Sequence, residues 1–208
     1  PSFTNPDTIC TNTTINFNNT STSMGGTITN WLWNFGDGNT DTAQQTTHLY
    51  RNSGTFNSFL TITTSFGCTD SVSVPVSVHP TVFANFNYSL ACTNRPINFI
   101  DSSVGTPISW RWNFGDGNTA STQNPIHIYL IPGNYLVELI ILNAEGCSDT
   151  ISKNVFVNTI PTPNFTADTA CFGTRTIFTN LTFNSQPIIQ YLWSFGDGNS
   201  SFGLNPTY

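Results

Sequence analysis

A short stretch that occurs three times constrains this chain more than any other feature. It begins with alternating aromatic residues, ends in Gly-Asp-Gly-Asn, and is found at Trp31–Asn39, Trp110–Asn118 and Tyr191–Asn199. Alternation with a period of two places the aromatic rings on one face of a β-strand. The glycines and the aspartate are typical of a tight turn. Each copy therefore predicts a core strand that enters a turn and then a second strand.

The spacing of the copies predicts the domain organisation. Trp33 and Trp112 lie 79 residues apart, and Trp112 and Trp193 lie 81 apart, a period that suits small β-sandwich domains in tandem. We predict domains at 1–80 and 81–161 and a partial third domain at 162–208, as part of a longer polypeptide. Pro80 and Pro161–Pro163 make short, stiff junctions, which predict a semi-rigid rod.

Composition excludes several functions. Only 8% of residues are charged, whereas the chain has 26 Asn and 53 Ser plus Thr, which favours an all-β fold with uncharged polar surfaces. The net charge is −6, so the chain lacks the basic surface that binding to nucleic acid requires. No apolar run reaches the length of a membrane-spanning helix, so we expect no membrane insertion in this segment. No catalytic motif is present, and we expect no enzyme activity.

The five cysteines follow the repeat. Cys10, Cys92 and Cys171 occupy one position of the repeat, and Cys68 and Cys147 occupy a second position, 79 residues apart. Regularly spaced cysteines in a β-rich chain favour disulfides and an oxidising, extracellular compartment. The odd count predicts that the partner of Cys171 lies outside this chain.

Three ordered motifs together resemble the PKD domain, a family named for polycystic kidney disease. The first is the turn sequence Trp-x-Phe-Gly-Asp-Gly, the second is Asn124-Pro125-Ile-His127-Ile-Tyr129, and the third is Gly133-Asn-Tyr135 before an alternating strand. The chain departs from the family at Asn34, Asn113 and Ser194, where Asp is frequent, and at Tyr208, which stands in the His position. The resemblance implies tandem immunoglobulin-like β-sandwiches. The Gly146-Cys147-Ser148-Asp149 sequence is also similar to repeats of very large bacterial surface adhesins exported by a gliding-type (type IX) secretion system.

For the disulfides we predict pairing within each complete copy, Cys10 with Cys68 and Cys92 with Cys147. A plain immunoglobulin sandwich raises an alternative, because the two cysteine positions then lie at opposite poles of the domain. In that case Cys10 would reach Cys147 of the next copy and join neighbouring domains.

The turn aspartates Asp37, Asp116 and Asp197 have two interpretations. As structural residues they would accept hydrogen bonds from backbone donors of the turn, while Trp33, Trp112 and Trp193 on the preceding strand would be buried in the core. As calcium ligands they would resemble the acidic ligands of related modules in secreted collagenases. Calcium sites usually gather several carboxylates, however, and each turn has only one. We favour the structural role and expect no metal or other cofactor. His48 and His127 follow their aspartates by 11 residues, and we interpret them as structural too.

One strand of the second copy differs from its counterpart. Alternation over 135–142 leaves Leu136, Ile140 and Leu142 on the outer face, where the first copy has Asn57, Thr61 and Thr63. We consider two interpretations, a face covered by a neighbouring segment or a contact with another copy of the chain.

These features support three hypotheses about function. The first is a structural and adhesive segment, a stalk or fibre of a cell-surface adhesin that contacts proteins or surface glycans and neighbouring copies of itself. The second is an accessory substrate-binding module of a secreted hydrolase. The third is a calcium-dependent adhesive switch.

Overall fold

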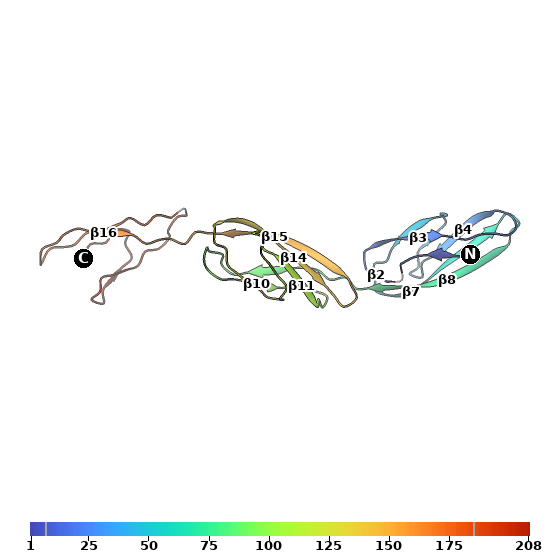
Figure 1. Ribbon diagram of the computed structural model, residues 1–208, viewed down its shortest axis with the longest axis horizontal. Helices are drawn as coiled ribbons and strands as arrows, with labels where there is room; N and C mark the ends of the chain where they lie inside the picture. The colour runs from blue at the N-terminus through green and yellow to red at the C-terminus, as the bar shows by residue number, and fades with distance from the viewer. Residues whose placement is uncertain (7, 185) are drawn as a thin grey trace.

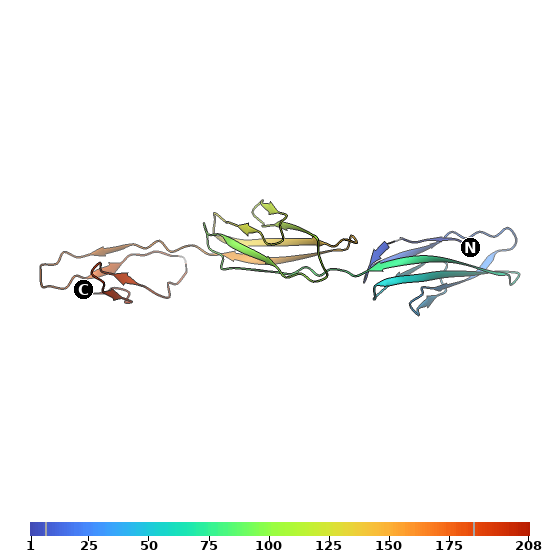
Figure 2. The ribbon, with the colours of Figure 1, turned by 90° about the horizontal axis from the view of Figure 1, so that it is seen from below.

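The computed structural model describes residues 1–6, 8–184 and 186–208 and shows three β-rich bodies arranged end to end, one for each sequence repeat (Figures 1 and 2). The N-terminus lies in the body at one end and the C-terminus in the body at the other (Figure 1). Every regular element of the described residues is a β-strand. None of the described residues belongs to a helix with the length and apolar character needed to cross a membrane. The fold is therefore a set of tandem β-sandwiches, as the sequence predicts.

The first repeat is a sandwich of two sheets. Its three-stranded sheet has the order β1 (Phe3–Thr4), β3 (Thr14–Asn19), β6 (Thr46–Leu49). Its five-stranded sheet has the order β2 (Thr8–Cys10), β8 (Thr69–His79), β7 (Gly54–Thr64), β4 (Ile28–Asn34), β5 (Thr40–Asp41). All neighbouring strands are antiparallel except β2 and β8, which pair in parallel with Cys10 opposite His79.

The second repeat has the same plan. One sheet has the order β13 (Ile126–His127), β10 (Ile97–Asp101), β9 (Phe86–Tyr88). The other has the order β12 (Thr119–Ala120), β11 (Ser109–Asn113), β14 (Gly133–Leu142), β15 (Ser148–Val157). A single parallel bridge between Cys92 and Asn158 stands in the place of the β2–β8 pairing.

The third repeat contains only part of this plan. Its strands form two pairs, β16 (Phe165–Ala167) with β17 (Phe178–Asn180) and β18 (Trp193–Ser194) with β19 (Ser200–Ser201). Nothing among its described residues corresponds to β14 and β15, the two longest strands of the second repeat.

The repeated strand with alternating aromatic residues, β4 in the first repeat and β11 in the second, builds the core. Trp33 and Trp112 are fully buried, and each indole contacts two aromatic rings of the facing sheet at centroid distances between 5.1 and 5.7 Å. Each indole N–H donates to a backbone carbonyl ten residues on, Ala43 at 2.8 Å and Thr122 at 3.0 Å. The alternation of the strand therefore places these rings in the interior, as the sequence predicts.

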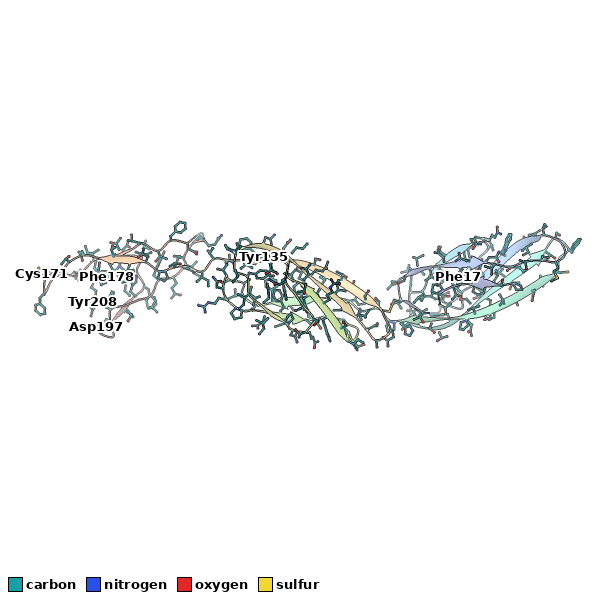
Figure 3. All side chains as sticks on the ribbon, in the orientation of Figure 1. Phe17, Tyr135, Cys171, Phe178, Asp197 and Tyr208 are labelled. Carbon is teal, nitrogen blue, oxygen red and sulfur yellow. A yellow bond between two sulfur atoms is a disulfide. The ribbon has the colours of Figure 1, made fainter. Side chains whose placement is uncertain are left out.

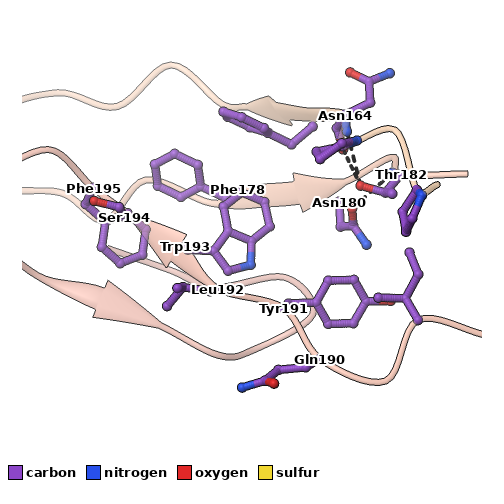
Figure 4. A pocket seen from close by; sticks show the side chains of 14 residues that line it. Asn164, Phe178, Asn180, Thr182, Gln190, Tyr191, Leu192, Trp193, Ser194 and Phe195 are labelled. Carbon is purple, nitrogen blue, oxygen red and sulfur yellow. Dashed lines mark hydrogen bonds between the residues drawn. The ribbon is translucent and has the colours of Figure 1, made fainter. Parts of the chain in front are cut away.

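Trp193 is an exception, because we expect it to be as buried as the other two. Its ring makes the same contacts with Phe165 and Phe178, but it is only half-buried. The side chains of β14 and β15 that cover Trp112 have no counterpart among the described residues of the third repeat. The uncovered rings of Trp193, Phe178 and Phe195 consequently line an open apolar pocket of about 350 Å³ (Figure 4).

Candidate functional site

The Gly-Asp-Gly turn is held by a compact set of hydrogen bonds. The carboxylate of Asp37 accepts the backbone N–H of Asn39 at 3.1 Å and the Asn39 side-chain N–H at 3.1 Å. Asn34 Oδ1 accepts the N–H of Gly36 at 2.9 Å, so the Asn that replaces the family Asp still closes the start of the turn. The second repeat has equivalent bonds at Asp116 and Asn113.

The first glycine of this turn cannot be replaced by a larger residue. Gly36 and Gly115 adopt φ values of 80° and 78°, a left-handed conformation that glycine favours. A Cβ atom on Gly115 would lie 2.7 Å from the carbonyl oxygen of Leu136, and one on Gly36 would lie 2.6 Å from that of Asn57. The turn therefore packs directly on the backbone of the neighbouring strand.

His48 and His127 lie against the turn rather than in an open cleft. The Nε2 atom of each is 2.7 Å from the Oδ2 atom of its turn aspartate, Asp37 or Asp116. Each imidazole stacks on the Phe of the turn, with centroids 4.0 and 4.1 Å apart. In the third repeat Tyr208 occupies this place, stacks on Phe195 and donates its hydroxyl to Asp197 (Figure 3). The phenol of Tyr208 thus makes the same two contacts as the imidazoles of His48 and His127.

The same contacts set the ionisation of the aspartates. Burial alone would raise the pKa of Asp37, but hydrogen bonds from His48 and Asn39 outweigh it, so the pKa is lowered. The pKa of Asp116 is lowered in the same way, against the effect of burial, by hydrogen bonds from Asn118 and His127. These carboxylates are therefore ionised partners of the turn at neutral pH.

That these aspartates hold no calcium stays a prediction. Both carboxylate oxygens of Asp37 already accept protein hydrogen bonds. Among residues 1–6, 8–184 and 186–208, no three His, Cys, Asp or Glu side chains are grouped so that they could hold a metal ion.

The disulfide pairing within each repeat is wrong for Cys10 and Cys147, which are bonded to each other. Because β2 pairs in parallel with β8, Cys10 lies beside His79, at the end of the first repeat that faces the second. Cys147 lies in the β14–β15 turn of the second repeat, and its Cα is 5.8 Å from that of Cys10. Cys68 lies in the β7–β8 turn at the opposite pole of its repeat, too far from Cys10 to bond. The alternative considered from the sequence, a bond between neighbouring repeats, is the one observed.

Cys92 holds the repeat position of Cys10, and Cys68 holds the repeat position of Cys147. In the described part of the chain, however, Cys68, Cys92 and Cys171 carry free thiols. Cys92 is bridged to Asn158 as Cys10 is to His79. The carbonyl of Cys68 accepts the N–H of Thr64, as that of Cys147 accepts the N–H of Asn143. A partner for Cys171 outside the chain stays a prediction.

Polar contacts that the sequence analysis did not identify reinforce the junction. Asn143 is buried, its Oδ1 accepts the N–H of Cys147 at 2.8 Å, and its Nδ2 donates to the carbonyl of Pro80 at 3.1 Å. The N–H of Thr81 donates to Thr11 Oγ1 at 3.1 Å. The first repeat has Thr64 in place of Asn143, so this residue is not part of the repeated pattern. The sequence signal for the junction contact is therefore only an Asn four residues before a repeat cysteine.

The outer strip of β14 is partly uncovered. Leu136 and Leu142 are exposed and Ile140 is half-buried, while Val137, Leu139 and Ile141 are fully buried between them. The flanking positions are Arg111 on β11 and Thr150 on β15, opposite Ile140. The strip is thus apolar at its centre and polar at its sides.

Comparison with known proteins identifies the family. The sequence profile described as PKD domain matches residues 1–79 and 77–157. The chain belongs to the PKD domain family. Its PKD domains are similar to parts of collagenase ColA of Bacillus cereus, 40% identical over 29% of this chain and 6% of that protein. They are also similar to pre-pro-metalloprotease PrtV of Vibrio cholerae, 26% identical over 66% of this chain and 15% of that protein.

Among solved structures, the PKD1 domain from the Vibrio cholerae metalloprotease PrtV is 26% identical. The match covers 37% of this chain and 96% of that domain, with a TM-score of 0.35. The chain spans only a small part of the curated relatives that it matches, 6% of collagenase ColA and 15% of PrtV.

Proposed function

We propose that this chain is a non-catalytic, extracellular segment of a larger cell-surface adhesin, in which tandem PKD domains form a semi-rigid stalk. The observation that carries this proposal is the Cys10–Cys147 bond, which joins one domain to the next instead of closing a single domain. The hydrogen bonds of Asn143 and Thr81 across the same junction restrict bending between the domains. A disulfide also suits an oxidising compartment outside the cell. The type IX secreted adhesins that the sequence resembles are the class of parent protein we favour.

The partners of such a stalk would be proteins or surface glycans and other copies of the same chain. The strip of Leu136, Ile140 and Leu142 is the candidate contact between copies. Its apolar centre with polar flanks has the character of a small protein interface. Nucleic acid is not a partner in this proposal, since the net charge is −6. The membrane interior is not a partner either, since no apolar run in this segment reaches the length of a spanning helix.

Small-angle X-ray scattering of the oxidised protein tests the stalk. The expected result is a long, narrow particle whose maximum dimension approaches the summed length of three domains in line. The Cys10→Ser, Cys147→Ser double variant is the matched control, and it should show a broader range of bend angles at the first junction. A compact particle for the oxidised protein would contradict the proposal.

The second candidate is an accessory module of a secreted hydrolase, and one observation favours it. Relatives that match include collagenases of Bacillus cereus and Vibrio alginolyticus and the metalloprotease PrtV of Vibrio cholerae. In this role the domains would orient a polymeric substrate. Co-sedimentation with insoluble collagen or cellulose tests it, and retention on either polymer with micromolar affinity would favour the module over the stalk.

A further inference from the structure

The Cys10–Cys147 bond divides the chain into an enclosed loop and two outer segments. The bonded residues are 137 positions apart, and the loop between them contains every strand from β3 to β14. Both buried tryptophans of the complete repeats, Trp33 and Trp112, belong to this loop. Outside it are residues 1–9, which include β1 and part of β2, and everything from β15 onward.

The outer segments follow the long axis of the rod. The β2 strand runs parallel to β8, and β8 ends at Pro80, so residues 1–10 lead toward the junction. The β15 strand begins at Ser148, next to the bond, and runs antiparallel to β14 toward the third repeat. Figures 1 and 2 both show β15 extending along its repeat, from the junction with the first repeat to the linker before the third. A short covalent route thus passes through both complete repeats.

We propose that this route, from residues 1–10 through the Cys10–Cys147 bond into β15, is a covalent load path that relieves both domain cores of tension. When the ends of the oxidised chain are pulled apart, the force passes through the sulfur–sulfur bond and never acts across the enclosed loop. The loop can lose its structure, but its residues add nothing to the length of the chain. The first two repeats are therefore inextensible while the bond is intact and become extensible when it is reduced.

The reduction step follows ordinary thiol–disulfide exchange. A dithiol reductant attacks one sulfur as a thiolate, releases the other cysteine, and then closes to its own disulfide while Cys10 and Cys147 each end as thiols. Two electrons pass from the reductant to the protein disulfide. The use of this device in a tension-bearing stalk rests on the function proposed above, whereas the load path depends only on the position of the bond.

The locked length can be calculated from the chain geometry. At about 3.6 Å for each residue, the 137 positions between Cys10 and Cys147 correspond to about 490 Å of chain. Bonds within each repeat, Cys10–Cys68 and Cys92–Cys147, would instead lock about 410 Å in two separate loops. Without any bond, no length is locked, and each complete repeat has an extended length of about 280 Å, of which it releases all but its folded length when it unfolds.

Single-molecule force spectroscopy on the whole chain, held at its two ends, distinguishes these cases. The oxidised protein should reach a final contour length about 490 Å shorter than the same protein in dithiol reductant. It should also lack the two long unfolding steps of the reduced protein, each of which equals the extended length of about 280 Å less the folded length of one repeat. A deficit near 410 Å, no deficit, or both long steps in the oxidised protein would overturn the proposal.

Two variants separate the bond from other effects of the reductant. The Cys10→Ser, Cys147→Ser double variant should behave as the reduced protein does, even in oxidising buffer. The Cys68→Ser, Cys92→Ser, Cys171→Ser triple variant keeps the observed bond and should retain the full deficit. If the double variant fails to fold, the comparison of oxidised and reduced wild-type protein still decides the question. The scattering experiment tests the stalk function independently of the load path. A flexible chain could carry this load path, and a stiff rod could lack it.

Discussion

At the scale of single residues, the buried tryptophans are the strongest determinants of stability. Trp112 is fully buried, contacts Phe86 and Phe99, and uses its indole N–H in a hydrogen bond. We predict that Trp112→Ala lowers the free energy of unfolding of the second repeat by about 3–5 kcal/mol, because it leaves a large cavity. Denaturant unfolding measures this change. Trp110→Ala, at a half-buried position of the same strand, should cost clearly less, and equal costs would contradict the assigned burial.

The ionisation of the turn aspartates predicts that the free energy of unfolding depends on pH. The pKa of Asp116 is lower in the folded protein than its ordinary value of 3.8. Its contribution is therefore present above about pH 4 and is lost as the pH falls through the lower, folded value. Asp116→Asn should lower the free energy of unfolding at pH 7 by about 1–3 kcal/mol, since it weakens hydrogen bonds to a charged group.

Thermal melts between pH 7 and pH 2 test this prediction. The gap between Asp116→Asn and the parent should narrow below about pH 4 as the parent loses the same contribution. Asp70→Asn is the control, because its carboxylate is 75% exposed, lies 3.7 Å from the N-terminal amine and accepts the N–H of the adjacent Ser71, with no histidine beside it among the described residues. A gap that persists unchanged at pH 2 would show that the carboxylate charge is not what holds the turn.

At the scale of elements, β14 differs from β7 in its outer face. Ile140 and Leu142 stand where the first repeat has Thr61 and Thr63. If the strip joins copies of the chain, Ile140→Thr with Leu142→Thr should shift the sedimentation coefficient to that of the monomer without unfolding the domain. Ile126→Thr with Ile128→Thr, at exposed positions in β13 of the other sheet and just after it, is the matched control and should leave the assembly intact. An unchanged coefficient in the first variant would remove the strip as an interface.

Element by element, the sequence predicted what periodicity determines and missed what depends on topology. The alternation of Val137, Leu139 and Ile141 was sufficient to place their side chains inside, because a strand has only two faces. The cysteine spacing could not decide the pairing, since both schemes use the same two repeat positions. The parallel pairing of β2 with β8 moves Cys10 to the junction, and three residues of strand carry no pattern that predicts a parallel neighbour. The burial of Trp193 likewise depends on strands that its own motif does not contain.

At the scale of the whole molecule, two PKD domains are joined by a covalent bond, a prolyl linker and buried polar contacts. Asn143 binds the linker and the turn of Cys147 at once. Asn143→Ala should therefore leave each domain folded but loosen the junction, because it leaves the Pro80 carbonyl without this donor. Hydrogen exchange should show faster exchange at the Cys147 amide in this variant. Unchanged protection there would mean that the disulfide alone fixes the junction.

Peptide mapping under non-reducing conditions tests most directly whether the disulfide joins neighbouring domains. Trypsin cleaves after Arg51, Arg111 and Lys153 but not at the Arg95-Pro96 bond, so it yields fragments 1–51, 52–111 and 112–153. These fragments contain Cys10, both Cys68 and Cys92, and Cys147, respectively. With free thiols blocked before digestion, we predict that 1–51 is linked to 112–153 and that 52–111 is released with two blocked cysteines. A single species that joins all three fragments through 52–111 would show bonds within each repeat and would contradict the account.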